Sequence, residues 1–165
     1  MPKVYPPSPR LRVVAILALV TLGGCGGRDN LPPMGQVSGK VTYKGKPLAT
    51  GMVVFSPLMG SEGQTGQLAT GMLGKDGSYE LSTFDDGDGA VLGEHLITVK
   101  AVEKVRTEKP NPKDTEQIRT PGPDGKLSYV FMKSLVPNKY ANPNMSPLRF
   151  KVAPGQNQHD IELTD

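Results

Sequence analysis

After residue 36 the chain is a succession of short runs in which apolar and polar side chains alternate. The clearest run lies at 37–44, where Val37, Val41 and Tyr43 share one parity and polar residues occupy the other. A period of two is typical of a strand with one buried face. Further strand-like runs lie at 52–56, 68–73, 78–82, 93–101, 148–152 and 159–164. About seven short strands separated by turns predict an all-β fold, an antiparallel β-sandwich of two sheets.

The turn residues also indicate which strands pair. Lys-Asp-Gly at 75–77 separates two strand-like runs and predicts a hairpin between them. Pro-Gly-Gln-Asn at 154–157 separates the last two runs, which we expect to form a closing pair.

Residues 102–146 do not follow this rhythm. They contain six prolines, eight basic and five acidic residues over 45 positions. A structureless connection of this length is unusual inside a compact domain unless it has a function or is disordered. We expect a long loop insertion that is mobile at 108–125, whereas the apolar segment 127–136 should pack as a strand or a short helix.

The first 24 residues predict a lipoprotein signal peptide. Three basic residues precede an apolar run at 13–22, which is too short to span a membrane but matches the core of a signal peptide. The run ends in Leu-Gly-Gly-Cys at 22–25, which resembles a bacterial lipobox. We expect cleavage between Gly24 and Cys25 and lipidation of Cys25 with diacylglycerol and an acyl chain such as palmitate. Cys25 is the one cysteine of the sequence, so it has no partner for an internal disulfide.

Cleavage changes the charge of the protein. The full chain has 19 basic and 16 acidic residues, and removal of Lys3, Arg10 and Arg12 leaves 16 of each. The basic pI of about 9.0 therefore belongs to the export signal, and nucleic acid is not an expected partner. The 20 glycines and 16 prolines remain, and they favour turns over a helical bundle.

The sequence then divides into three parts. Residues 1–24 are the signal peptide, 25–35 the lipidated N-terminus and a flexible tether, and 36–165 the sandwich domain. We expect an exported protein whose soluble domain lies in the periplasm or at the cell surface. Gly26 after the cysteine, where retained lipoproteins carry Asp, resembles the pattern of the outer membrane more than that of the inner membrane.

Several segments together resemble a known domain family. The run 37–48, the strand 52–55, the segment 75–81 and the strand 93–99 are similar to carboxypeptidase-regulatory-like, transthyretin-type domains. Val-Pro-Asn-Lys-Tyr at 136–140, followed by Ser-Pro-Leu at 146–148, resembles the tail of small planctomycete-type bacterial lipoproteins. The resemblance implies a Greek-key sandwich and an envelope location. It implies no catalytic residues.

One acidic cluster offers oxygen ligands for calcium. Asp85, Asp86 and Asp88 lie in a glycine-rich segment, and calcium takes six to eight oxygens. The sequence departs from a calcium loop of the EF-hand type, because Ala90 and Val91 occupy positions that require a ligand and a glycine. A solvated turn between strands is the favoured alternative.

The two histidines do not form a catalytic or metal-binding motif. His95 and His159 each share the parity of the apolar residues of their strand and begin an inward face. Zinc needs at least three suitable ligands, so we expect half-buried histidines with satisfied hydrogen bonds. No nucleophile motif accompanies them, and we predict that the protein is not an enzyme.

The remaining candidate is an aromatic patch. Tyr129, Phe131 and Tyr140 lie in the 102–146 insertion and could contact a partner or stack on a sugar; alternatively they cap the open end of the sandwich. We expect a lipid-anchored envelope module that binds or scaffolds an unknown ligand, with envelope proteins or polysaccharide as partners. The alternative is a carbohydrate-binding module that uses these aromatics. Apart from the lipid, and calcium if the acidic cluster binds it, no cofactor is expected.

Overall fold

The computed structural model describes residues 1–3, 31–58, 66–109, 118–122 and 124–165. The chain divides into two units, Met1–Asn30 and Leu31–Asp165, and the fold described below is that of the second unit. The lipobox with Gly24 and Cys25, most of the signal peptide and most of the tether lie outside the described residues. They remain predictions from the sequence.

The first sheet is built around one long strand, β1 (Met34–Tyr43). It begins two residues before the predicted domain boundary at 36. Three short antiparallel strands pair with one side of β1, namely β2 (Lys46–Pro47), β5 (Ser78–Glu80) and β6 (Ala90–Val91). Two strands pair with β1 in parallel, namely β12 (Gly155–Gln158) and β13 (Ile161–Leu163).

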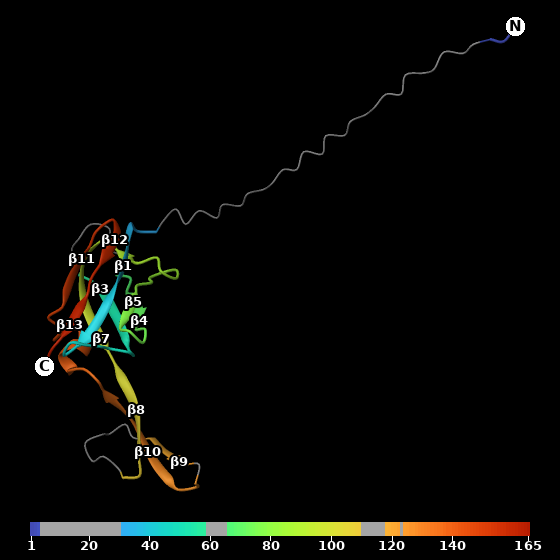
Figure 1. The fold of residues 1–165 in the computed structure, drawn as a ribbon. Coiled ribbons are helices and arrows are strands. Elements are labelled where there is room, and N and C mark those ends of the chain that lie inside the picture. The colour runs from blue at the N-terminus through green and yellow to red at the C-terminus, as the bar shows by residue number, and fades with distance from the viewer. Residues whose placement is uncertain (4–30, 59–65, 110–117, 123) are drawn as a thin grey trace. The chain divides into compact units, whose positions relative to one another are not determined.

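The second sheet is antiparallel throughout and has the order β11-β7-β3-β4. Its strands are β3 (Met52–Pro57), β4 (Ala69–Met72), β7 (Gly93–Lys100) and β11 (Arg149–Val152). Figure 1 shows the long strands β3 and β7 behind β1. The protein is therefore all-β, as the alternation predicted, and its two sheets form a sandwich.

The predicted hairpin around 75–77 forms only in part, and the predicted closing pair is wrong. The turn at 75–77 leads from β4, which pairs with β3, to β5, which pairs with β1, and one isolated bridge between Thr70 and Ser82 links the two segments. The closing pair is likewise divided, because β11 pairs with β7 while β12 and β13 pair with β1. In both places the chain crosses between sheets. The second crossing enters the first sheet where β1 begins, so β12 runs parallel to β1 and not antiparallel as expected.

The apolar core lies between the sheets. In β1 the buried residues are Val37 and Val41, which are the positions that the period of two predicts. Phe55 of β3 and Ile97 of β7 face them from the second sheet and are fully buried. Alternation along each strand thus supplies one apolar face, and the two faces pack on each other.

The described residues between 102 and 134 form a third sheet, which we call the arm. It has the order β8-β10-β9, with β8 (Val102–Thr107), β9 (Ile118–Pro121) and β10 (Leu127–Ser134), all antiparallel. The predicted strand or short helix at 127–136 is confirmed by β10, whereas the prediction of a loop is wrong for β8 and β9. Opposite charges pair across the strands, as in the 3.1 Å ion pair between Lys133 and Glu103, and these charges concealed the strand pattern in the sequence.

A short helix, α1 (Asn138–Ala141), follows the arm. The backbone N–H of Leu135 donates a hydrogen bond of 2.9 Å to the carbonyl of Ala101, and this bond closes the base of the arm. Within the described ranges, no helix combines the length and the apolar character that crossing a membrane requires.

Candidate functional site

The N-terminal segment and the arm join the sandwich at opposite ends of β7. The carbonyl of Pro33 accepts a 3.0 Å hydrogen bond from the N–H of Leu92, just before β7 begins. The arm begins at Val102, just after β7 ends. An extended strand of eight residues spans about 26 Å. The chain that comes from Cys25 therefore enters the domain at one end, and the arm leaves it at the other.

The three aromatic residues predicted to form one patch are not together. Tyr129 and Phe131 lie two residues apart in β10, on the same face of the arm, and both are half-buried. Tyr140 lies in α1, is 4% exposed and belongs to the sandwich core. Its hydroxyl accepts a hydrogen bond of 3.1 Å from the N–H of Thr164. The patch reduces to two residues, because the helix turns Tyr140 inward, where it packs into the core.

The remaining aromatic face also carries apolar and cationic groups. The guanidinium of Arg119 lies over the ring of Tyr129, 5.7 Å from its centroid. Val105 of β8 pairs with Phe131 and is half-buried, while Leu127 is 56% exposed. A hollow of about 490 Å³ lies between the end of β8 and the turn that precedes β10. The arm thus presents a mixed apolar and basic surface.

The acidic cluster at 85–88 forms a turn in which Asp88 is the central acceptor. Its Oδ1 accepts the N–H of Thr83 at 2.7 Å, and its Oδ2 accepts the N–H groups of Phe84 and Asp85 at 2.9 and 2.8 Å. Among the described residues, no three Asp, Glu, His or Cys side chains are grouped to hold a metal ion. The structure therefore supports the turn, since Asp88 directs both oxygens at the backbone.

His95 is inward-facing, as predicted, but it is neither half-buried nor satisfied. Its exposed fraction is 0%, and its ring lies 5.9 Å from that of Phe55. Nδ1 lies 3.0 Å from the carbonyl oxygen of Gly93, whereas Nε2 has no hydrogen-bond partner in the described part of the chain. Burial lowers the pKa of His95, and the hydrogen bond to Gly93 opposes this in part. The ring therefore packs as an aromatic group in the core, where burial disfavours its charged form.

His159 fits the prediction of a half-buried residue. Its ring stacks on Phe150 with 4.2 Å between the centroids. Burial lowers the pKa of His159, and the charge of Asp160 opposes this in part. The two histidines are held by aromatic packing around Phe55.

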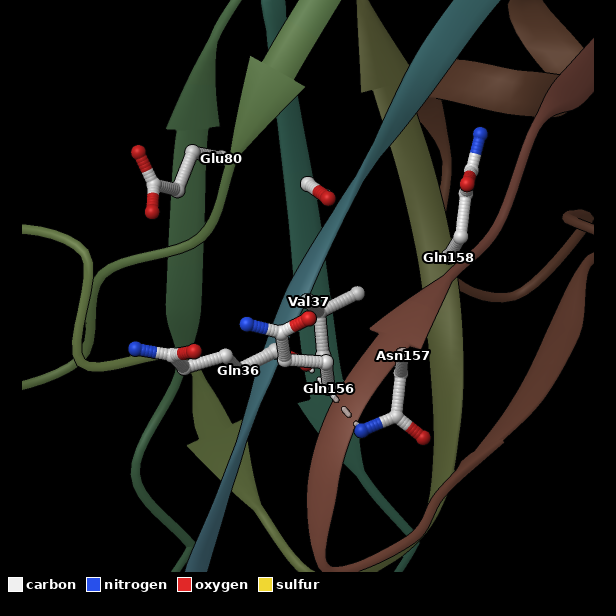
Figure 2. A pocket seen from close by; sticks show the side chains of 7 residues that line it. Gln36, Val37, Glu80, Gln156, Asn157 and Gln158 are labelled. Atoms are coloured by element: carbon white, nitrogen blue, oxygen red, sulfur yellow. Dashed lines mark hydrogen bonds between the residues drawn. The ribbon is translucent and has the colours of Figure 1, made fainter.

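The structure reveals one polar hollow that sequence reasoning missed. It has a volume of about 380 Å³ and lies on the outer face of the first sheet, over β12, β1 and β5. Figure 2 shows its side chains around β1, with glutamines on β1 and β12 and a glutamate on β5. The residues that line it are Gln36, Val37, Ser38, Glu80, Gln156, Asn157 and Gln158.

The sequence predicted the outward position of only some of the residues that line this hollow. Gln36 and Ser38 have the outward parity of the first predicted strand. Gln156, however, was assigned to a turn, whereas it lies in β12 directly beside Gln36. Only the parallel pairing of two strands 120 residues apart brings these amides together.

The comparisons with known proteins leave the family open. No family model and no curated protein matches the chain. A 9R-lipoxygenase from Cyanothece PCC8801 is similar over 80% of this chain and 16% of its own, with 12% identity and a TM-score of 0.32. A DUF3823 family protein from Parabacteroides merdae is similar over 81% of this chain and 47% of its own, with 15% identity and a TM-score of 0.34. The chain spans less than half the length of either structure, and these distant likenesses carry no argument about function.

Proposed function

We propose that this protein is an exported, lipid-anchored module of the cell envelope that binds or scaffolds and does not catalyse. The observation that carries the proposal is the lipobox at 22–25, which follows a basic segment and a short apolar run. On the same proposal, the sandwich is a Greek-key, carboxypeptidase-regulatory-like domain of the kind that the motifs at 37–48 and 136–148 resemble.

The arrangement of the domain supports a role in contacting a partner. Once Cys25 is lipidated, eight residues, 26–33, connect it to β1, and they span at most about 28 Å when extended. The arm leaves from the opposite end of β7, so its attachment point is the end of the sandwich farther from the entry of the tether. An arm that leaves this end of the sandwich is available to contact proteins or polysaccharide.

The anchor is tested by Cys25→Ser in the full-length chain. We expect the natural protein to partition with membranes and to yield an N-terminal peptide of acylated cysteine by mass spectrometry. The variant should remain unprocessed and unacylated, because the thiol is the group that accepts the lipid. Thr21→Ser, outside the lipobox, serves as the control. Normal acylation and membrane partitioning of the Cys25→Ser protein would contradict the proposal.

A carbohydrate-binding role is the second candidate, and the pair Tyr129 and Phe131 favours it. Two half-exposed aromatic rings on one face of a strand suit stacking against sugar rings. The test is binding of the full-length protein to insoluble envelope polysaccharide, with Tyr129→Ala and Phe131→Ala. Tyr43→Ala, a partly exposed tyrosine of β1, is the matched control. Loss of binding in the arm variants alone supports this role, and unchanged binding contradicts it.

A further inference from the structure

We propose that the hollow over β12, β1 and β5 is a binding site for a neutral, hydroxyl-rich ligand, namely a segment of an uncharged polysaccharide. The proposal rests on the function proposed above only in taking the protein to be a binding module. It names a ligand class and a site that is separate from the arm, and it does not depend on the lipid anchor.

The first observation is that the glutamine amides in the hollow are unused. Gln36, Gln156 and Gln158 are exposed, and no hydrogen bond to a described residue engages their side-chain amides. Each amide offers two donors and one acceptor oxygen with two lone pairs. Ser38 adds a hydroxyl group from the neighbouring position on β1. The surface therefore has a large unfilled capacity for hydrogen bonds.

The second observation is that the strands beneath these groups are held firmly. Gln36 and Gln156 are direct neighbours in the parallel pairing of β1 and β12. Nδ2 of Asn157 donates hydrogen bonds to the carbonyls of Gln36 at 3.1 Å and Ala153 at 2.8 Å, and its Oδ1 accepts the N–H of Ala153 at 3.0 Å. Asn157 thus braces the start of β12 against β1. The backbone that carries the glutamines therefore needs little reorganisation when a ligand binds.

The composition of the lining excludes other ligand classes. Among the described residues that line the hollow there is no lysine or arginine, and an anionic group would lack the cationic partner that such groups require. Glu80 is the one carboxylate in this described lining, too few for a divalent cation that takes six or more oxygens. Val37 is the one apolar side chain in it and is 1% exposed, so an apolar ligand would find no surface. A neutral ligand that both donates and accepts hydrogen bonds remains.

Two features favour a sugar chain over an extended peptide. The backbone of β1 in the floor of the hollow pairs on both sides, so a peptide cannot add there as a further strand. A second hollow of about 540 Å³ shares Ser38 and Glu80 with the first and continues across β5 to Met72, whose exposed fraction is 72%. The two hollows together give room for several linked rings, and Met72 supplies apolar surface for the C–H face of one ring.

The test is a titration of the full-length, detergent-solubilised protein with three neutral oligosaccharides: cellopentaose, maltopentaose and laminaripentaose. We expect the side-chain amide NMR signals of Gln36, Gln156 and Gln158 to shift with at least one of them. The Gln156→Ala/Gln158→Ala double variant should lose at least tenfold in affinity. Gln67→Ala, the same change at an exposed loop residue, is the matched control and should bind normally.

Three results would overturn this proposal. One is the absence of amide shifts with all three sugars at millimolar concentration. Another is binding that the glutamine double variant leaves intact but Tyr129→Ala abolishes, which places the sugar on the arm and leaves the second candidate function standing. The last is an uncharged Gly-Ser repeat peptide that shifts the same amides equally, which would assign the site to a peptide. None of these outcomes bears on the Cys25→Ser result, so the two proposals fail separately.

Discussion

The phenol of Tyr79 donates a hydrogen bond of 2.7 Å to the main-chain carbonyl of His159, 80 residues further along the chain. This carbonyl lies in the break between β12 and β13, where β1 has no continuous parallel partner. Tyr79→Phe should destabilise the domain by about 1–2 kcal/mol, because it leaves the partly buried carbonyl without its donor. Denaturant unfolding measures the loss. Tyr43→Phe, which removes an exposed hydrogen bond to Asp165, should have little effect. Equal effects of the two changes would contradict this role.

Stability should fall as the pH drops through the titration range of histidine. Burial lowers the pKa of His95 in the folded state, so below about pH 6.5 the unfolded state binds more protons than the folded one. The stabilisation is present above pH 6.5 and is lost as the pH falls towards the folded pKa. For one titrating residue, the free energy of unfolding changes by at most about 1.4 kcal/mol per pH unit.

His95→Phe isolates this contribution. The ring packs against Phe55, so phenylalanine suits the site and removes the titrating group. Unfolding curves between pH 7.5 and 5 should show a flatter dependence for this variant than for the natural protein. His159→Phe is the control, and its free energy of unfolding should keep the pH dependence that His95 contributes. An unchanged slope in His95→Phe would show that burial of this ring does not carry the pH dependence.

Gly89 is needed where its turn crosses β1. Its φ is +91°, and a Cβ at this position would collide with the carbonyl oxygen of Gly35 and the Cα of Gln36. Gly89→Ala should cost about 2 kcal/mol or more, since strain and a backbone collision add. Gly45→Ala has a similar φ of +74° but no atom within 4 Å, so it should cost about 1 kcal/mol. Thermal unfolding of both variants separates the cost of the positive φ, which both share, from the cost of the backbone collision, which only Gly89→Ala has.

Asp88 should matter for stability and Asp86 should not. The Asp88 carboxylate accepts three backbone N–H groups, and its removal should cost about 1–2 kcal/mol. Asp86→Ala in the same turn is the matched control and should change the unfolding midpoint very little. If the two variants unfold alike, the carboxylate of Asp88 does not organise the turn.

The sandwich should fold without the arm. Every residue of the core cluster lies outside 102–134, and Ala101 and Leu135 are already joined by a hydrogen bond. Replacement of 102–134 by Asn-Gly, a two-residue hairpin loop, should leave far-ultraviolet circular dichroism typical of β-structure and a cooperative unfolding transition. An unfolded product would show that the arm contributes to the folding of the core.

The period of two identified the buried faces correctly. Val37 and Val41 point inward and Ser38 outward, because successive side chains of a strand lie on opposite faces. The same parity placed His95 inward, although it did not indicate that Nε2 would lack a partner. That property depends on which groups surround the ring, and these come from several strands.

The partners of the strands could not be derived in the same way. A turn such as 75–77 specifies a local reversal of the chain, yet β4 and β5 use it to pass from one sheet to the other. β8 was mistaken for a loop because charged residues occupy half of its positions, where pairing across strands stabilises them. Tyr140 was grouped with Tyr129 because they are close in sequence, whereas α1 turns it into the core.

The sequence by itself determined the all-β class, the inward and outward parity of the long strands and the turn at 75–77. These features depend on residues within a few positions of each other. Only the tertiary structure decided that Gly35 pairs with Gly155, that β12 runs parallel to β1 and that the glutamines of both strands line one hollow. The alternation of apolar and polar residues shows which face of a strand is apolar. Packing between segments far apart in the chain determines which strands pair.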